Sequence, residues 1–460
     1  MSSIRATGIA IGLLFALGLG PQDPAPADAA AMRAIVDQYF AAYAKEDLEA
    51  FRSVWHSASP DVNVKKALAT SQFFVQNFRF SGIGVSRWTV SPDGPVARVV
   101  VNARVTDTKR KQTEAVTWLR DITFRQDEGA WRIWRETSPV DELAAALEKA
   151  PAQEDRMALL EKEPDLVTES LRAALSRRAN TAYMKRDSVT PEALLKVALT
   201  VAQRTEDPRS LWSAWLDLGL HYEGIGDLQA ASEAFAKARD FLESSGDTAR
   251  LGDAEMNMAA IRYKQAVLEP NEKARLPLYA EAAGHYRRAL DAYEAVGETG
   301  WHASILHSLG NVSYLLGQWD QALDYYRRTL AIQEQALAAA GDKPTMLQIR
   351  GVAAAHQAIG MVLKEQADYP SAFEALGKSL AAYASFDDKS GMVNVEREIG
   401  EVCRLEGDFA LALSHFLNSL DMAVAIPDAT RDPVNEAKLL AEIGEVYGLE
   451  QRYAVALDYL

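Results

Sequence analysis

The sequence predicts a small α+β domain followed by an all-α solenoid of helical hairpins. Two helical segments come first, and four segments rich in β-branched and aromatic residues follow them before residue 137. No segment after Glu136 resembles a strand, and small residues then recur at regular intervals along the chain. The first pattern predicts the α+β domain and the second predicts the solenoid.

The first 30 residues are expected to form a secretory signal peptide and a linker. Arg5 precedes an uncharged, largely apolar stretch of 13 residues from Gly8 to Gly20, which is too short to span a bilayer. A Pro/Ala-rich stretch, PQDPAPADAAA, follows it. We therefore expect an exported protein, periplasmic or secreted, with no transmembrane anchor after cleavage; a disordered apolar tail is the alternative.

Residues 31–148 have the pattern of an α+β domain. Ile35, Tyr39 and Tyr43 are spaced four apart, as on one face of a helix, and LEAFRSVW predicts a second short helix. The predicted strands are VSRWTV, VARVVVNARV, EAVTWLRDITF and AWRIWRE. Turn sequences SPDG and QDEG separate the first from the second and the third from the fourth, so we expect hairpins in an antiparallel sheet.

The opening FAAYAKEDLEAF and the closing EGAWRIW give this domain a resemblance to the NTF2-like superfamily. That resemblance implies a curved sheet wrapped around helices, forming a cone with a pocket. Some relatives are enzymes that use a carboxylate base and a hydrogen-bond donor in the pocket, but the residues here allow no such set to be placed.

Two residues are candidates for lining this pocket. Val116, Trp118, Ile122 and Phe124 share one strand face by alternation, and Arg120 lies on the same face. Trp118 and Arg120 are therefore the pocket candidates. Arg120 could be a buried cation that awaits an anionic ligand, although we favour a position near a strand end or on the open face, with the charge in water.

Residues 149–460 contain an internal repeat. After Gly310 come Gly317, Ala322, Tyr326 and Thr329, at offsets of 7, 12, 16 and 19. Copies with matching offsets centre on Gly219, Gly360, Gly400 and Gly444, and less regular copies centre on Ala179 and Ala260. Each glycine follows Leu or Ile within a helical pattern, so each repeat is predicted to be a helical hairpin.

The pattern resembles the tetratricopeptide repeat, in which helix A carries a small residue and helix B carries a small, an aromatic and another small residue. The resemblance implies a solenoid over residues 149–460 with an incomplete last repeat. A helical glycine costs about 0.5–1 kcal/mol relative to alanine. We expect Gly310 and its equivalents to lie where helices cross, with Tyr326 and Phe416 filling the adjacent volume.

The A helices of such a solenoid would line a concave groove. Positions three before, one after and four after each glycine predict its exposed row. The candidates are His307, Asn311, Tyr314, Gln357, Met361, Lys364, Arg397, Glu401 and Arg404. This mixed row suits an extended peptide or a partner's helix, although each residue alone could belong to a solvated helix face.

Composition limits the other chemistry of the chain. The net charge of −15 opposes binding to nucleic acid or to an anionic membrane. Cys403 is the single cysteine, so no intramolecular disulfide forms, and its position in the repeat predicts a buried thiol. No phosphate-loop, zinc-protease or nucleophile-elbow motif is present, and we predict no catalytic residue, cofactor or metal in this chain.

The sequence therefore predicts a non-enzymatic scaffold that binds a partner protein or peptide. One alternative is a small-molecule-binding NTF2-like domain supported by the solenoid. Another rests on LLEKEPDLVTESLRAAL and the DK-containing repeat junctions, which resemble exported bacterial proteins that place such repeats before a CHAT peptidase domain. Because the sequence stops at Leu460 within a predicted helix, this alternative expects a catalytic domain beyond it.

Overall fold

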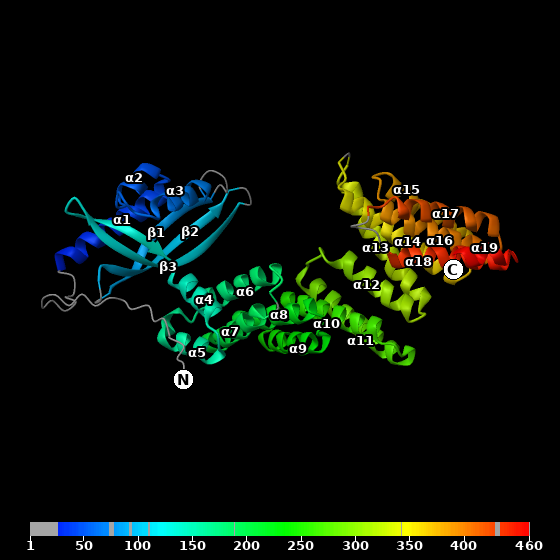
Figure 1. The fold of residues 1–460 in the computed structure, drawn as a ribbon, viewed down its shortest axis with the longest axis horizontal. Coiled ribbons are helices and arrows are strands. Elements are labelled where there is room, and N and C mark those ends of the chain that lie inside the picture. The colour runs from blue at the N-terminus through cyan, green and yellow to red at the C-terminus, as the bar shows by residue number, and fades with distance from the viewer. Residues whose placement is uncertain are drawn as a thin grey trace, which may run out of the picture. The chain divides into compact units, whose positions relative to one another are not determined.

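The computed structural model describes residues 26–72, 78–91, 94–108, 111–187, 189–341, 343–427 and 433–459 (Figure 1). The chain divides into two compact units, residues 1–205 and 206–460. The expected signal peptide and the first five residues of its linker, up to residue 25, lie outside the described residues. The described part begins with helix α1 (Pro26–Lys45).

The first unit begins with helices and a four-stranded sheet, as the sequence predicted. Helix α1 is followed by α2 (Leu48–Ser53) and by α3 (Val62–Thr70), which was not predicted. The strands are β1 (Phe78–Val90), β2 (Val96–Asp107), β3 (Gln112–Asp127) and β4 (Ala130–Thr137). All neighbours are antiparallel in the order β1-β2-β3-β4, so the α+β prediction is confirmed.

One face of the sheet packs against α1, α2 and α3. Ile122 and Phe124 are completely buried on this face, as the alternation predicted, and Trp118 is half-buried beside them. Phe51 and Trp55 contribute to the same core from α2 and the residues after it. Because one face of the sheet is covered by apolar residues, the register of the strands is fixed.

Four helices complete the first unit. They are α4 (Pro139–Lys149), α5 (Gln153–Lys162), α6 (Glu169–Met184) and α7 (Thr190–Thr205), with a short 3₁₀ turn η2 (Pro164–Leu166) before α6. Ala179 is buried on α6, which pairs with α7 as the irregular first repeat predicted. The expected domain boundary after residue 148 therefore lies inside the first unit.

The second unit is a series of helical hairpins, in which each A helix pairs with the B helix that follows (Figure 1). The A helices are α8 (Pro208–Gly224), α10 (Thr248–Leu268), α12 (His302–Leu315), α14 (Met346–Glu365), α16 (Lys389–Glu406) and α18 (Pro433–Leu449). The B helices are α9 (Leu228–Ser245), α11 (Glu272–Val296), α13 (Trp319–Ala339), α15 (Tyr369–Ala384), α17 (Phe409–Val424) and α19 (Tyr453–Tyr459).

The repeated glycines lie at the crossing of helices A and B, as predicted. A Cβ atom added to Gly400 would lie 2.7 Å from the ring of Phe416, and one added to Gly360 would lie 2.6 Å from Leu376 Cγ. Gly310 faces the ring of Tyr326 in the same way. Each glycine therefore makes room for the large side chain 16 residues later, and this packing offsets its weak helix propensity.

The small residue at offset 19 has a second role in three repeats. The Ser379 hydroxyl donates a hydrogen bond to the carbonyl oxygen of Ala353 at 2.8 Å, and Ser419 does the same to Val393 at 2.8 Å. Both serines are completely buried. Thr329 makes the equivalent, longer contact of 3.5 Å with Ala303. The hydroxyl thus connects helix B to the backbone of helix A.

Successive repeats meet through a further close contact that was not predicted. Gly391 at the start of α16 faces the ring of Tyr383 at the end of α15, with no room for a Cβ atom. One repeat earlier, Gly351 faces the side chain of Gln333 from α13. Each of these B helices therefore presents a large residue near its end to a glycine of the next A helix.

The irregular repeat formed by α10 and α11 differs from its prediction by one residue. Ala259 is completely buried between Met258 and Ile261, whereas Ala260 is half-buried. The same burial pattern surrounds the glycines of the other A helices, so Ala259 is the equivalent small residue. The longer connection obscured the alignment because it changes the spacing between helices A and B.

Candidate functional site: the A-helix face

The nine residues of the predicted row lie on three successive A helices, α12, α14 and α16. All nine are half-buried rather than exposed. Helix α14 contacts both α12 and α16, so residues at equivalent offsets come together along one surface. We call this surface the A-helix face; it comprises the nine row residues with Glu365, Glu398, Glu442 and Glu445.

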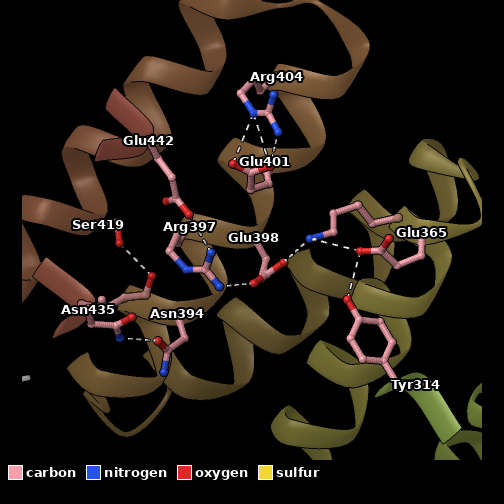
Figure 2. A network of polar contacts seen from close by, with 12 residues as sticks. Tyr314, Glu365, Asn394, Arg397, Glu398, Glu401, Arg404, Ser419, Asn435 and Glu442 are labelled. Carbon is pink, nitrogen blue, oxygen red and sulfur yellow. Dashed lines mark hydrogen bonds and ion pairs between the residues drawn. The ribbon is translucent and has the colours of Figure 1, made fainter. Parts of the chain in front are cut away.

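A chain of polar contacts crosses the A-helix face from α12 to α18 (Figure 2). The Tyr314 hydroxyl donates a hydrogen bond to Glu365 Oε1 at 2.9 Å. Lys364, the neighbour of Glu365, places Nζ 2.8 Å from Glu398 Oε2. Glu398 also pairs with Arg397, and Arg397 Nη1 lies 2.9 Å from Glu442 Oε1. These contacts connect four A helices through charged and hydroxyl groups.

Arg404 has two carboxylate partners on the same face, and Figure 2 shows the nearer one, Glu401. Its Nη2 lies 2.8 Å from Glu401 Oε2 on the same helix, and its Nη1 lies 3.6 Å from Glu445 Oε1 on α18. The guanidinium of Arg404 and that of Arg397 are therefore both engaged within the chain. Neither is an open cation that awaits an anionic partner.

The deepest groups of this network are carboxylates. Only 3% of the Glu398 side chain is exposed, so its charge depends on Lys364 and Arg397 for compensation. Glu442 is 18% exposed, and its Oε2 atom has no hydrogen-bond partner in the described part of the chain. Burial raises the pKa of Glu442 above its ordinary value, and Arg397 offsets only part of that rise.

The two predicted row residues at the other end of the face support a core side chain. The Tyr326 hydroxyl donates a hydrogen bond to Asn311 Oδ1 at 2.6 Å. The His307 ring lies against the Tyr326 ring, with 5.3 Å between centroids. Burial lowers the pKa of His307, so the imidazole is neutral near pH 7. His307 is thus a packing residue rather than part of a solvated helix face, the alternative that the sequence left open for each row residue.

Gln357 and Met361 differ from the row residues that pair with other side chains. Neither side chain forms a hydrogen bond or ion pair with any residue in the described ranges. Both lie on α14 at the centre of the A-helix face and are half-buried. An uncommitted amide and a flexible thioether at this position are suited to contact a second molecule.

Sequence reasoning placed only Glu401 among the five carboxylates of the face, although a signal for others exists. Glu398 and Glu442 both stand two residues before the glycine of their repeats, Gly400 and Gly444. An acidic residue at the same offset in successive A helices indicates a position that faces a neighbouring A helix. Glu445 stands one residue after Gly444, an offset already used for the predicted row, although it was not among the candidates. Glu365 has none of these offsets, and only the structure places it beside Tyr314.

In the first unit, the two pocket candidates lie near a buried carboxylate. Trp118 packs edge-on against the Tyr43 ring, with 6.2 Å between centroids. Arg120 Nε lies 3.1 Å from Glu136 Oε1, and only 6% of the Glu136 side chain is exposed. The expectation that Arg120 holds its charge in water is therefore wrong, because Glu136 supplies an internal partner.

Glu136 is the centre of a cluster that sequence reasoning did not place. The Tyr39 hydroxyl donates a hydrogen bond to Glu136 Oε2 at 3.0 Å, and Lys65 Nζ lies 2.9 Å from the same oxygen. Burial raises the pKa of Tyr39 well above its ordinary value, and the Glu136 charge adds to the rise. With three donors around one carboxylate, the cluster is satisfied internally.

Two clefts border the sheet of the first unit. The larger, of about 750 Å³, is lined by Trp118, Arg120 and Arg98 among others. Arg98 is held by Asp121, with Nε 2.8 Å from Oδ1. Arg87 also lines this cleft, is exposed, and has no ion pair within the described residues. The smaller cleft, of about 510 Å³, includes His56 and Asp127 in its wall.

Other reactive groups offer little chemistry. Cys403 is buried as predicted, and burial raises the pKa of its thiol to about 11, so the thiolate is scarce at neutral pH. No cluster of His, Cys, Asp and Glu side chains in the described ranges is arranged to hold a metal ion. Among the described helices, none is both long and apolar enough to cross a membrane.

The fold and the A-helix face define a helical repeat protein. Residues 274–335 match the family model described as Tetratricopeptide repeat. This segment takes in most of α11, all of α12 and most of α13. This segment therefore matches a repeat of the tetratricopeptide type, as the offsets around Gly310 predicted. No curated protein matches the chain.

Several solved structures are similar to parts of the chain. BtubC from P. vanneervenii is 22% identical with a TM-score of 0.41, over 55% of this chain and 93% of that one. The apo form of RapI is 17% identical with a TM-score of 0.44, over 63% and 74%. The apo quorum sensor NprR from B. thuringiensis is 13% identical with a TM-score of 0.43, over 70% and 95%.

Proposed function

We propose that the second unit is a non-enzymatic scaffold that binds a partner protein or peptide along the A-helix face. One observation carries this proposal: equivalent positions of successive A helices come together in a continuous row of half-buried polar and amphipathic side chains. Repeats of the tetratricopeptide type typically mediate protein–protein interaction. An extended peptide or a helix can contact such a row over several repeats.

Site-specific photo-crosslinking tests this proposal. A photoreactive amino acid replaces Gln357 or Met361, which lie on the A-helix face and take no part in its ion pairs. The same replacement of Gln335, an exposed residue on helix α13, is the control. We expect a covalent adduct with one discrete partner from the two face positions and none from the control. Equal adducts from all three positions would contradict docking on this face.

A second candidate function belongs to the first unit and is favoured by the larger cleft. Trp118 and Arg120 both line it, and Arg87 offers it a cation without an internal partner in the described residues. The proposed ligand is a small organic anion. Calorimetric titration with aromatic and aliphatic carboxylates should show binding to the wild-type protein. The Arg87→Ala variant should lose this binding. The Arg104→Ala variant, an exposed control on β2, should retain it.

Two further aspects remain proposals from the sequence. Export is supported by the pattern from Arg5 to Gly20, and the mass of the mature protein recovered outside the cytoplasm would test it. The alternative that the repeats are the docking arm of a CHAT-type peptidase also stays a prediction.

A further inference from the structure

Charge on the A-helix face is not balanced. Three cations, Lys364, Arg397 and Arg404, lie among five carboxylates. The five are Glu365, Glu398, Glu401, Glu442 and Glu445. Each cation is paired with carboxylates on two sides, and Arg397 Nε, which has no hydrogen-bond partner among the described residues, is buried and closed to an anionic ligand. Two negative charges remain in excess.

The charged side chains of the A-helix face also differ in how much of each is exposed to solvent. The side chains of all three cations are recessed, with Lys364, Arg397 and Arg404 12%, 23% and 22% exposed. Three of the carboxylates are recessed as well: Glu398, Glu401 and Glu442 are 3%, 13% and 18% exposed. The most exposed members are carboxylates, at 36% for Glu365 and 57% for Glu445. A molecule that approaches α14, α16 and α18 therefore meets negative charge first.

We infer that the partner segment that docks on the A-helix face is basic, with lysine or arginine side chains directed at Glu365 and Glu445. This inference rests on the proposed function, because it names the chemistry of the partner at the same site. Charge complementarity supplies the argument: a basic segment gains from both outer carboxylates, whereas an acidic segment is repelled by them and finds every cation already paired. Neutral Met361 and Gln357 lie on α14, the helix that carries Glu365, and fit an apolar or amide side chain of the same segment.

The test uses the full chain and three fluorescein-labelled peptides of about twelve residues, long enough in extended form to cross three helices. One peptide alternates lysine with leucine and serine, and the others carry glutamate or glutamine in place of each lysine. Fluorescence anisotropy should show that the lysine peptide binds about tenfold more tightly than the glutamine peptide, and that added salt weakens its binding. The glutamate peptide should bind least.

Matched variants separate the face from the general acidity of the protein. Glu365→Gln with Glu445→Gln removes both outer charges, and the amide oxygen introduced by the first substitution can still accept the Tyr314 hydrogen bond. Glu334→Gln with Glu374→Gln removes two exposed charges from B helices. We expect the first pair to weaken binding of the lysine peptide about tenfold and the control pair to change it less than about twofold.

The outcomes distinguish the inference from the proposed function. A photoreactive group on each peptide reports where it binds. If the glutamine or glutamate peptide crosslinks to α14 and α16 as well as the lysine peptide does, the face is a docking surface but the basic partner is wrong. If the lysine peptide crosslinks elsewhere, or if none of the peptides binds, the inference is overturned. Equal losses in both variant pairs also overturn it.

Discussion

At the scale of single residues, the helical repeats depend on pairs in which a glycine of helix A faces a large side chain of helix B. Gly360 and Leu376 form such a pair between α14 and α15, and Gly400 and Phe416 form the next. At the glycine position, the size of the side chain matters more than its hydrophobicity, because even one added methyl group would overlap the large partner side chain. Packed interiors lose stability when atoms are added as well as when they are removed.

Gly360→Ala should therefore lower the free energy of unfolding by about 1–3 kcal/mol. The added Cβ would meet Leu376 Cγ at 2.6 Å and the carbonyl oxygen of Ala372 at 3.2 Å, and the backbone oxygen cannot rotate away. Gly377→Ala on α15 is the control, because a Cβ there meets nothing within 4 Å. It should stabilise the helix by up to about 1 kcal/mol. Urea unfolding measures both, and a loss in both variants would contradict the packing explanation.

Histidine burial gives the protein a predictable pH response. Burial lowers the pKa of His307 and of His356 below 6.5. The unfolded chain therefore binds more protons than the native chain as the pH falls, and stability is lost on acidification through and below pH 6.5. The double variant His307→Gln, His356→Gln should show a smaller fall in unfolding midpoint between about pH 7.5 and 5.5. An unchanged pH slope would exclude these two histidines as its source.

At the scale of elements, polar side chains define how neighbouring helices and strands meet. In the first unit, Glu136 joins β4 to α1 through Tyr39, to α3 through Lys65 and to β3 through Arg120. In the second unit, buried hydroxyls join helix B to the backbone of helix A. Both contacts are satisfied only at one relative position of the elements, which gives the packing specificity as well as stability.

Replacing Glu136 by leucine should lower the stability of the first unit by about 3–5 kcal/mol, because Lys65 and Arg120 lose the charge that compensates them. Glu136→Gln keeps a hydrogen-bond acceptor at the same place, so a smaller loss is expected. Hydrogen exchange of amides in α1 and β4 measures the change. Equal protection in wild type and Glu136→Leu would show that the cluster contributes nothing.

The buried hydroxyls allow a comparison within one hairpin. Ser379→Ala should cost about 1 kcal/mol, since the carbonyl of Ala353 loses a buried side-chain donor. Ser385, just after the end of the same helix, donates to Ala382 in an exposed position, so Ser385→Ala should be almost neutral. Thermal unfolding of the two variants provides the measurement, and similar shifts would argue against a special role for the buried bond.

Local sequence patterns predicted the elements better than their polar contacts. The offsets around Gly310 located the crossings, because packing of small residues repeats with the helices. Glu136 was missed for a local reason: the register between β3 and β4 shifts at Thr123 and Phe124, leaving Trp134 unpaired. This irregularity places Glu136 on the same buried side as Ile133, whereas strict alternation would separate them. Four carboxylates of the A-helix face, Glu365, Glu398, Glu442 and Glu445, were missed because each has a partner one repeat away.

At the scale of the whole molecule, the second unit is built from contacts between successive helices. Every B helix from α9 to α17 contacts the A helix before it and the A helix after it. Stability in such an array is the sum of the hairpins and of the interfaces between neighbours, and a perturbation weakens with distance along the array.

Gly400→Ala should therefore destabilise the repeats unevenly. Hydrogen exchange should accelerate most in α16 and α17, less in α14 and α15, and least in α8 and α9. Mass spectrometry of exchanged peptides measures this gradient directly. Uniform acceleration from α8 to α17 would indicate a single cooperative core and would contradict the linear organisation.

The contact between the end of one B helix and the start of the next A helix has a consequence for how this gene can change. Gly391 accommodates the ring of Tyr383, and Gly351 accommodates Gln333. Excising α14 and α15 would bring Gln333 opposite Gly391. The Gln333 side chain is smaller than the Tyr383 phenol, so part of the space that the phenol now occupies would become empty. Loss of one repeat by recombination between neighbouring copies would thus create a junction whose two sides do not match, and we expect such a deletion to cost stability beyond the loss of the repeat itself.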